Sequence, residues 1–208
     1  MQPCPASRIA VWLSVGESEA DIPIAFSQLS ESDKNKLKRV KHTRKRLEFL
    51  SARAAFSKLG LDVGHLHFSP EGKPLFENKL VALSHNHMYG AAISHDTSAV
   101  GIDVEALNRR VERIRHKFIH PSEEQVAAEY GELFLWVAKE AAYKMHGRKQ
   151  LDFLDDLRIE KDMNGQLWAL VNDAGQPLRG RLFHVRGQET LMCWCVDSQL
   201  STEEMRTE

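Results

Sequence analysis

The sequence predicts an α+β fold made of two similar halves, residues 1–99 and 100–208. Each half contains one main segment whose apolar residues recur at helical spacing, together with several short apolar runs bounded by turn residues. No low-complexity linker separates the halves, so we expect them to pack tightly. The halves share a layout of elements rather than a repeated sequence.

The first half should open with a buried strand over residues 8–15. Ser30 then caps a polar helix over about 32–40, and a stronger helix runs from Thr43 until Gly60 ends it. The strands that follow are short, and we expect them over 65–68, 80–84 and 91–94.

The second half should open with a strand over residues 99–105. Ser122 and Gln125 have the spacing of a capping box, and a helix from about 132 to 146 ends at Gly147. The chain then returns to strands, which we expect over 157–160, 167–171, 181–185 and 191–196.

Composition excludes several classes of protein. The formal net charge of −1 gives no support for binding to nucleic acid or anionic membranes. The apolar stretch over residues 9–15 is too short to span a membrane and lacks the pattern of a signal peptide. Cys4, Cys193 and Cys195 are too few for a disulfide framework, so we interpret them as reduced thiols of a cytoplasmic protein.

Three carboxylates and a lysine lie in two short stretches. Asp103 and Glu105 are two apart in an apolar run, so on a strand they share one face. Glu140 and Lys144 are four apart and share one face of the predicted helix. Oxygen ligands beside a cationic acid suit a hard metal ion and the movement of a phosphate-linked group. The alternatives are two solvated strand carboxylates and an ordinary helix-surface ion pair.

Other residues suit the binding of an anion. Lys73 lies in the turn PEGKP, and Ser84 and His85 come at the end of a predicted strand. Arg46 and Arg53 are seven residues apart on the strongest helix, so both should point the same way. The alternative for these arginines is a pair of solvated side chains.

Histidines could in principle form a zinc site. His65 with His67, and His85 with His87, have the H-x-H spacing that suits zinc on a strand, and His95 lies close by in the sequence. The flanking segments offer no partner set with the helical spacing of a zinc hydrolase. A zinc-dependent hydrolase is therefore a minor alternative.

Together, these stretches resemble the 4′-phosphopantetheinyl transferase superfamily. The resemblance rests on GIDVE at 101–105 and WVAKEAAYK at 136–144, preceded by GKP at 72–74 and SH at 84–85. The upstream RKRLEFLSAR is similar to the arginine-bearing helix of the siderophore-synthetase branch. The chain departs from that branch at Ala52, where glycine is common, and at His87, where a small residue is commoner.

The resemblance implies two α+β halves related by a pseudo-twofold, with coenzyme A in the cleft between them. It implies transfer of phosphopantetheine from coenzyme A to a serine of an apo acyl or peptidyl carrier protein, with release of 3′,5′-ADP. The catalytic residues would be Glu140, as the base, and Lys144, as the partner of the leaving phosphate. The ligands of Mg²⁺, or of Mn²⁺ in its place, would be Asp103, Glu105 and Glu140. The coenzyme would be bound by Arg46, Arg53, Lys73, Pro74, Ser84, His85 and Asp103.

The implied protein is a single-chain, monomeric enzyme of the cytoplasm that serves peptide, polyketide or siderophore synthetases. It would bind neither nucleic acid nor membranes. Besides the zinc hydrolase, two alternatives remain: a non-catalytic module that binds coenzyme A or a carrier protein, and a plain interaction domain whose charged pairs decorate its surface.

Overall fold

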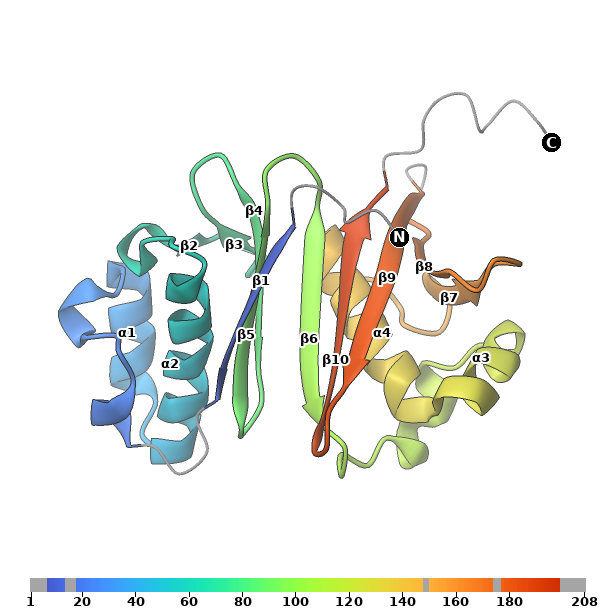
Figure 1. The fold of residues 1–208 in the computed structure, drawn as a ribbon, viewed down its shortest axis with the longest axis horizontal. Helices are drawn as coiled ribbons and strands as arrows, with labels where there is room; N and C mark the ends of the chain where they lie inside the picture. The colour runs from blue at the N-terminus through green and yellow to red at the C-terminus, as the bar shows by residue number, and fades with distance from the viewer. Residues whose placement is uncertain (1–6, 14–17, 148–149, 174–176, 199–208) are drawn as a thin grey trace.

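The computed structural model of the chain describes residues 7–13, 18–147, 150–173 and 177–198. Two antiparallel sheets pack against each other, and helices cover their outer faces (Figure 1). The predicted α+β class is confirmed. The pseudo-twofold relation and the division at residue 100 stay predictions.

The smaller sheet has the strand order β1-β5-β4, with every neighbouring pair antiparallel. Its strands are β1 Arg8–Leu13, β4 Leu80–His85 and β5 Tyr89–His95. The predicted opening strand is present over 8–13, but its side chains are exposed or half-buried rather than buried, because β1 is an edge strand. Residues 14 and 15 lie outside the described part of the chain.

Helix α2 (Thr43–Lys58) covers this sheet on the side away from the larger one, and α1 (Glu31–Arg39) lies beside α2 (Figure 1). The predicted cap is confirmed, because Ser30 Oγ accepts a hydrogen bond from the N–H of Asp33 at 3.3 Å. Gly60 follows the last turn of α2 with φ +77°, a conformation that favours glycine.

A small two-stranded ribbon of β2 (His67–Phe68) and β3 (Pro74–Leu75) joins α2 to β4. The strand predicted over 65–68 is shorter than expected, because its start belongs to a 3₁₀ turn, η3 (Val63–His65), capped by Asp62. Two further 3₁₀ turns precede α1: η1 Glu19–Asp21 and η2 Phe26–Gln28.

The larger sheet has the order β6-β10-β9-β8-β7 and is antiparallel throughout. Its strands are β6 Val100–Ala106, β7 Leu157–Lys161, β8 Leu167–Val171, β9 Leu178–Arg186 and β10 Thr190–Asp197. The long helix α4 (Glu132–His146) lies across one face of this sheet, chiefly over β6 and β10. Gly147 ends α4 with φ +76°, as predicted.

Between β6 and α4 the chain forms η4 (Glu112–Lys117), η5 (Pro121–Glu123) and α3 (Glu124–Tyr130). The predicted capping box at Ser122 and Gln125 is wrong by two positions. The carboxylate of Glu123 instead accepts the N–H of His120 at 2.9 Å, and the His120 ring accepts the N–H of Ser122. The carboxylate of Glu123 is the better acceptor for the free N–H group at this helix start.

An apolar cluster joins the two sheets. It contains Ala91 and Ile93 from β5 and Ile102 and Val104 from β6, each at most 2 % exposed. This contact fixes β6, the edge strand of the larger sheet, beside β4 of the smaller one. Residues from both sheets can therefore meet at the open edge of β6.

No helix in the described ranges is long and apolar enough to cross a membrane. Cys193 and Cys195 are buried free thiols, as expected, and Cys4 lies outside the described residues.

Candidate functional site

The predicted carboxylates of β6 face α4. Asp103 lies opposite Cys193 in the β6–β10 ladder, and Cys193 is part of the core beneath α4. Gly101 allows the helix to approach, since a Cβ at this position would lie 1.9 Å from the carbonyl oxygen of Ala141. The close contact brings the side chains of α4 to those of β6.

Asp103, Lys144 and Ser84 form one hydrogen-bonded network. Lys144 Nζ lies 2.6 Å from Asp103 Oδ1 and 3.0 Å from Ser84 Oγ. The Ser84 hydroxyl donates to Asp103 Oδ1 at 2.7 Å and accepts the N–H of Val104 at 3.3 Å. Every hydrogen-bonding position of this hydroxyl is thus used, and it joins β4, β6 and α4 at one point.

The other two carboxylates lie in partly buried positions near Asp103. Burial, and next the negative charge of Asp103, raise the pKa of Glu105 to about 7, although Arg109 opposes the shift. Burial and the charge of Asp103 also raise the pKa of Glu140, against the charge of Lys144. At both glutamates, burial and the charge of Asp103 thus outweigh the opposing charges of Lys144 and Arg109.

The donor atoms of this set fit a hard divalent cation. All three side chains offer carboxylate oxygens, and Asp103 Oδ2 is buried without a hydrogen-bond partner. In the described part of the chain, no three histidine, cysteine or acidic side chains are gathered closely around one point. Asp103 is instead paired with Lys144 at 2.6 Å, and Glu105 with Arg109 at 3.2 Å.

Lys73 and Pro74, predicted to bind the coenzyme, reach the C-terminal end of α4. Lys73 Nζ donates to the carbonyl oxygens of Met145 at 3.3 Å and His146 at 3.4 Å, a favourable place for a cation. Burial lowers the pKa of Lys73. The side chain crosses Gly147 so closely that a Cβ there would lie 2.3 Å from Lys73 Cδ.

A cavity of about 150 Å³ opens beside this lysine. Its apolar walls include Phe68, Pro74, Leu83 and Tyr143, and Lys144 lies at its edge. Through Lys144 the cavity adjoins the Asp103 network, and it offers apolar surface next to the ammonium groups of Lys73 and Lys144.

His85 lies in a second, wider and more polar hollow of about 570 Å³. Burial lowers the pKa of His85 to about 4, although Glu48 opposes the shift and lies 3.8 Å from the ring. The basic groups that share this hollow are Arg44, Lys45 and Arg109, and Glu105 also lines it. The hollow therefore connects the carboxylates of β6 with a group of cations on α2.

Arg46 and Arg53 point the same way, as predicted, but toward α1 rather than toward solvent. The guanidinium of Arg53 makes two hydrogen bonds to Asp33, at 2.8 and 2.7 Å, and is 4 % exposed. Its charge is still close enough to lower the pKa of His85. A role for Arg53 in coenzyme binding stays a prediction.

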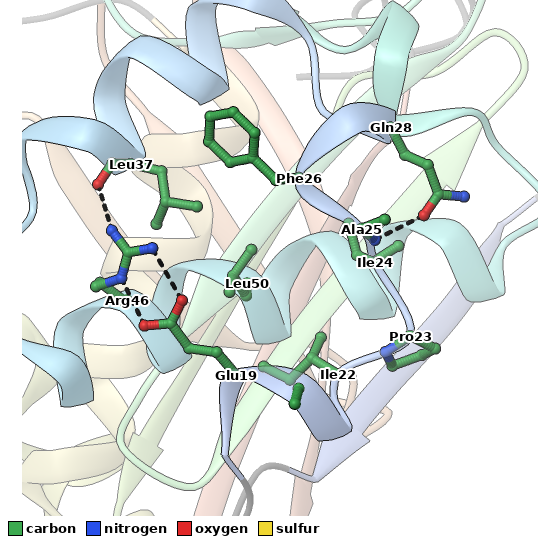
Figure 2. Close-up of a pocket in the computed structure, with 11 residues that line it drawn as sticks. Glu19, Ile22, Pro23, Ile24, Ala25, Phe26, Gln28, Leu37, Arg46 and Leu50 are labelled. Atoms are coloured by element: carbon green, nitrogen blue, oxygen red, sulfur yellow. Dashed lines mark hydrogen bonds and ion pairs between the residues drawn. The ribbon is translucent and has the colours of Figure 1, made fainter.

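Arg46 lines a different cavity, of about 600 Å³, between the η1–η2 segment and helices α1 and α2 (Figure 2). It binds Glu19 through two nitrogens, at 2.5 and 2.9 Å, and donates to the carbonyl oxygen of Leu37 at 2.7 Å. The structure therefore does not bring Arg46 together with the network around Asp103.

Several residues of the site were not predicted from the sequence. Arg109 follows Glu105 by four positions, and Lys45 precedes Glu48 by three, so spacing alone could have suggested both pairs. Tyr143 had no such signal, because its place in the cavity depends on β3 and β4 packing beside α4.

The zinc site that was kept as a minor alternative finds no support among the described histidines. His65 lies 3.2 Å from Glu77 at the surface, and His95 accepts the N–H groups of Thr97 and Ser98 in a turn. These contacts give both rings ordinary structural roles.

Comparison with known families gives one match. Residues 99–195 match the model of the 4′-phosphopantetheinyl transferase superfamily, which confirms the superfamily predicted from the motifs. The matched range contains Asp103, Glu105, Glu140 and Lys144. No match is found among curated proteins.

Proposed function

This chain belongs to the 4′-phosphopantetheinyl transferase superfamily, and we propose that it moves the phosphopantetheine arm of coenzyme A to a serine of an apo acyl or peptidyl carrier protein. The superfamily makes the chain a transferase of phosphopantetheine in general. The donor, the acceptor and the metal are the specific parts of the proposal. The serine oxygen forms a bond to the phosphorus that carries pantetheine, the bond from that phosphorus to the bridging oxygen breaks, and 3′,5′-ADP leaves.

Glu140 supplies the base for this transfer. Its carboxylate lies beside Asp103, and burial raises its pKa, which makes it a stronger proton acceptor than an exposed glutamate. It therefore takes the proton of the serine hydroxyl when that oxygen attacks.

Lys144 follows Glu140 by one helical turn and lies on the same face of α4. Its ammonium stabilises the negative charge that collects on the leaving phosphate. The cavity beside Lys73 and Tyr143 then receives the adenine, and the hollow around His85 receives phosphate groups of the coenzyme.

Asp103, Glu105 and Glu140 would hold Mg²⁺, or Mn²⁺ in its place. When bound, the ion supplies positive charge to the pyrophosphate. Asp103 is the best placed of the three ligands, because Ser84 fixes the direction of its carboxylate. The same proposal includes a cytoplasmic monomer that serves peptide, polyketide or siderophore synthetases.

The Ser84–Asp103–Lys144 network is the observation that supports this function most directly. It brings the ammonium of Lys144, the carboxylate of Asp103 and the hydroxyl of Ser84 on β4 to one point. A surface ion pair would not need a buried aspartate or a hydroxyl from the other sheet.

Mass spectrometry of apo carrier proteins, incubated with coenzyme A, Mg²⁺ and this protein, tests the proposal. The expected result is a mass gain equal to one phosphopantetheine on the acceptor, prevented by excess chelator or by Asp103→Asn. Binding of coenzyme A without transfer to any of a broad set of carriers would favour the non-catalytic module instead.

A further inference from the structure

The cavity beside Arg46 is separate from the network around Asp103 and has the size of a ligand site. Its volume is about 600 Å³, and pockets for small molecules in proteins measure roughly 300–1,000 Å³. Its walls come from the η1–η2 segment and from helices α1 and α2 (Figure 2). They are mainly apolar, and their buried side chains are Ile22, Ile24, Leu37 and Leu50. The apolar part of a ligand would be removed from water in this cavity.

Arg46 gives the cavity a binding group for an anion. Its Nη1 donates to the carbonyl oxygens of Leu37 at 2.7 Å and Val40 at 3.3 Å, at the C-terminal end of α1. A cation is favoured at a helix C-terminus, so these contacts hold the guanidinium whatever binds its other edge. That other edge, formed by Nε and Nη2, contacts both carboxylate oxygens of Glu19 at 2.5 and 2.9 Å (Figure 2). The guanidinium is therefore fixed in an orientation that suits a carboxylate.

Glu19 reaches Arg46 from a short element at the surface. It is the first residue of the three-residue turn η1. Its side chain is 33 % exposed and that of Arg46 is 26 % exposed. A partly exposed ion pair of this kind contributes little to stability. A carboxylate from outside the chain can therefore replace Glu19 at small cost.

Replacement of Glu19 would leave positive charge at this cavity. Among the lining residues that the structure describes, Glu19 is the only acidic one. Lys38 adds a second cation, because its Nζ lies 5.8 Å from the ring centre of Phe26, a lining residue that is 44 % exposed. The charges thus favour an anionic ligand over a neutral or cationic one.

We propose that this cavity binds a small monocarboxylate with an apolar body, and that the ligand carboxylate takes the place of Glu19 on Arg46. The apolar body packs against Ile22, Ile24 and Leu50. In the ligand-free protein the Glu19 carboxylate occupies the position of the ligand carboxylate. This inference does not depend on the transfer activity, because the site shares no residue with the network around Asp103.

Octanoate is the probe, titrated by calorimetry into the full chain without coenzyme A. Octanamide has the same body without the charge, and acetate has the charge without most of the body. Both should bind about tenfold or more weakly than octanoate, since each lacks one of the two contributions. Methyl NMR of labelled isoleucines locates the site. The signals of Ile22 and Ile24 should shift, while that of Ile102, buried between the two sheets, should not.

Two substitutions test the role of the ion pair. Glu19→Gln should strengthen octanoate binding about two- to fivefold, because the competing carboxylate is gone. Its matched control is Glu31→Gln, which loses an exposed ion pair with Lys34 away from the cavity and should leave the affinity unchanged. Arg46→Met should weaken octanoate binding about tenfold or more, whereas Arg39→Met, at the exposed end of α1, should not.

Equal affinity for octanoate and octanamide, or an unchanged affinity in Glu19→Gln, would overturn the inference. Both of these comparisons keep Arg46, so they decide the matter even if Arg46→Met does not fold. None of the measurements uses coenzyme A or an acceptor protein. Failure to bind octanoate would therefore leave the proposed transfer standing, and failure of the transfer would leave this site standing.

Discussion

The ammonium of Lys144 lies 2.6 Å from Oδ1 of Asp103, so the proposed partner of the leaving phosphate is bound to a proposed ligand of the metal. Lys144 thus acts as the counter-ion of Asp103 in the ligand-free protein. A divalent cation at Asp103 would compete with this ammonium for the same carboxylate, which would free Lys144 to turn to a phosphate.

Lys144→Met should therefore bind a divalent ion more tightly than the wild-type protein when no coenzyme is present. Lys144 is 29 % exposed, and a partly exposed ion pair is worth about 0.5–1 kcal/mol, so the gain should be roughly two- to fivefold. Titration with Mn²⁺, followed by electron paramagnetic resonance, measures it. Turnover should fall by orders of magnitude at a nearly unchanged melting temperature. Lys73→Met is the control, since Lys73 contacts main-chain carbonyls rather than Asp103. Equal Mn²⁺ affinity in Lys144→Met and wild type would contradict competition between the metal ion and the Lys144 ammonium for Asp103.

Gly101→Ala should damage both stability and activity. The new Cβ would lie 1.9 Å from the Ala141 carbonyl oxygen and 2.5 Å from the Met145 nitrogen, so α4 must move away from β6. Overpacking of this kind costs about 1–3 kcal/mol, which urea denaturation can measure. The shift also separates Glu140 and Lys144 from Asp103, so turnover should fall in the protein that remains folded.

Gly187→Ala is the matched control for this change. Its Cβ would meet only the Thr190 carbonyl oxygen, at 3.7 Å, which is an ordinary contact. Equal losses of stability in the two variants would mean that the close approach of α4 to β6 has no special importance.

Lys139 and Glu123 form a fully buried ion pair at 2.7 Å beneath α4. Lys139 also donates to the carbonyl oxygens of Phe153 and Leu157, both at 2.8 Å, so it ties α4 to the first residue of β7 and to the loop before it. Lys139→Met should lower the free energy of unfolding by about 3–5 kcal/mol, because Glu123 is left buried without its cation.

The double variant Lys139→Met/Glu123→Gln tests the cause of that loss. Removal of the unpaired charge should restore part of the stability, as measured by thermal and urea denaturation. If the double variant is as unstable as the sum of the two single variants, the lost main-chain contacts of Lys139 explain the effect rather than the buried charge of Glu123.

The sequence predicted those helices and strands that can be recognised from the spacing of apolar residues and the turn residues next to them. Helices α2 and α4 and strands β6 and β8 agree closely with the expected ranges, because each combines a clear period with a glycine, a cap or a turn at its ends. The carboxylates of β6 and α4 could also be expected to share faces. Their meeting depends on Gly101, whose contact with α4 no local pattern reveals.

The roles of the basic residues were harder to predict. Arg53 is committed to Asp33, twenty positions earlier, and Arg46 to Glu19, so the spacing that put both arginines on one face said nothing about their partners. The link between Ser84 and Lys144 joins residues sixty positions apart. Such contacts are set by the packing of the two sheets, which the sequence pattern indicates only in outline.

His85 should gain a proton when a phosphate group binds beside it. Burial lowers the pKa of His85 to about 4, so the ring is neutral at pH 6 in the ligand-free protein. A bound phosphate dianion favours the imidazolium, which raises the pKa, so binding of 3′,5′-ADP should take up a proton at His85. Affinity should accordingly rise as the pH falls from 8 toward 7, where the phosphate still carries most of its second charge. Calorimetry at pH 7 with chelator, in two buffers of different ionisation enthalpy, measures the uptake. His85→Gln keeps a hydrogen-bond donor but should abolish the proton uptake. The same uptake in His85→Gln would assign the proton to another group and remove His85 from the phosphate site.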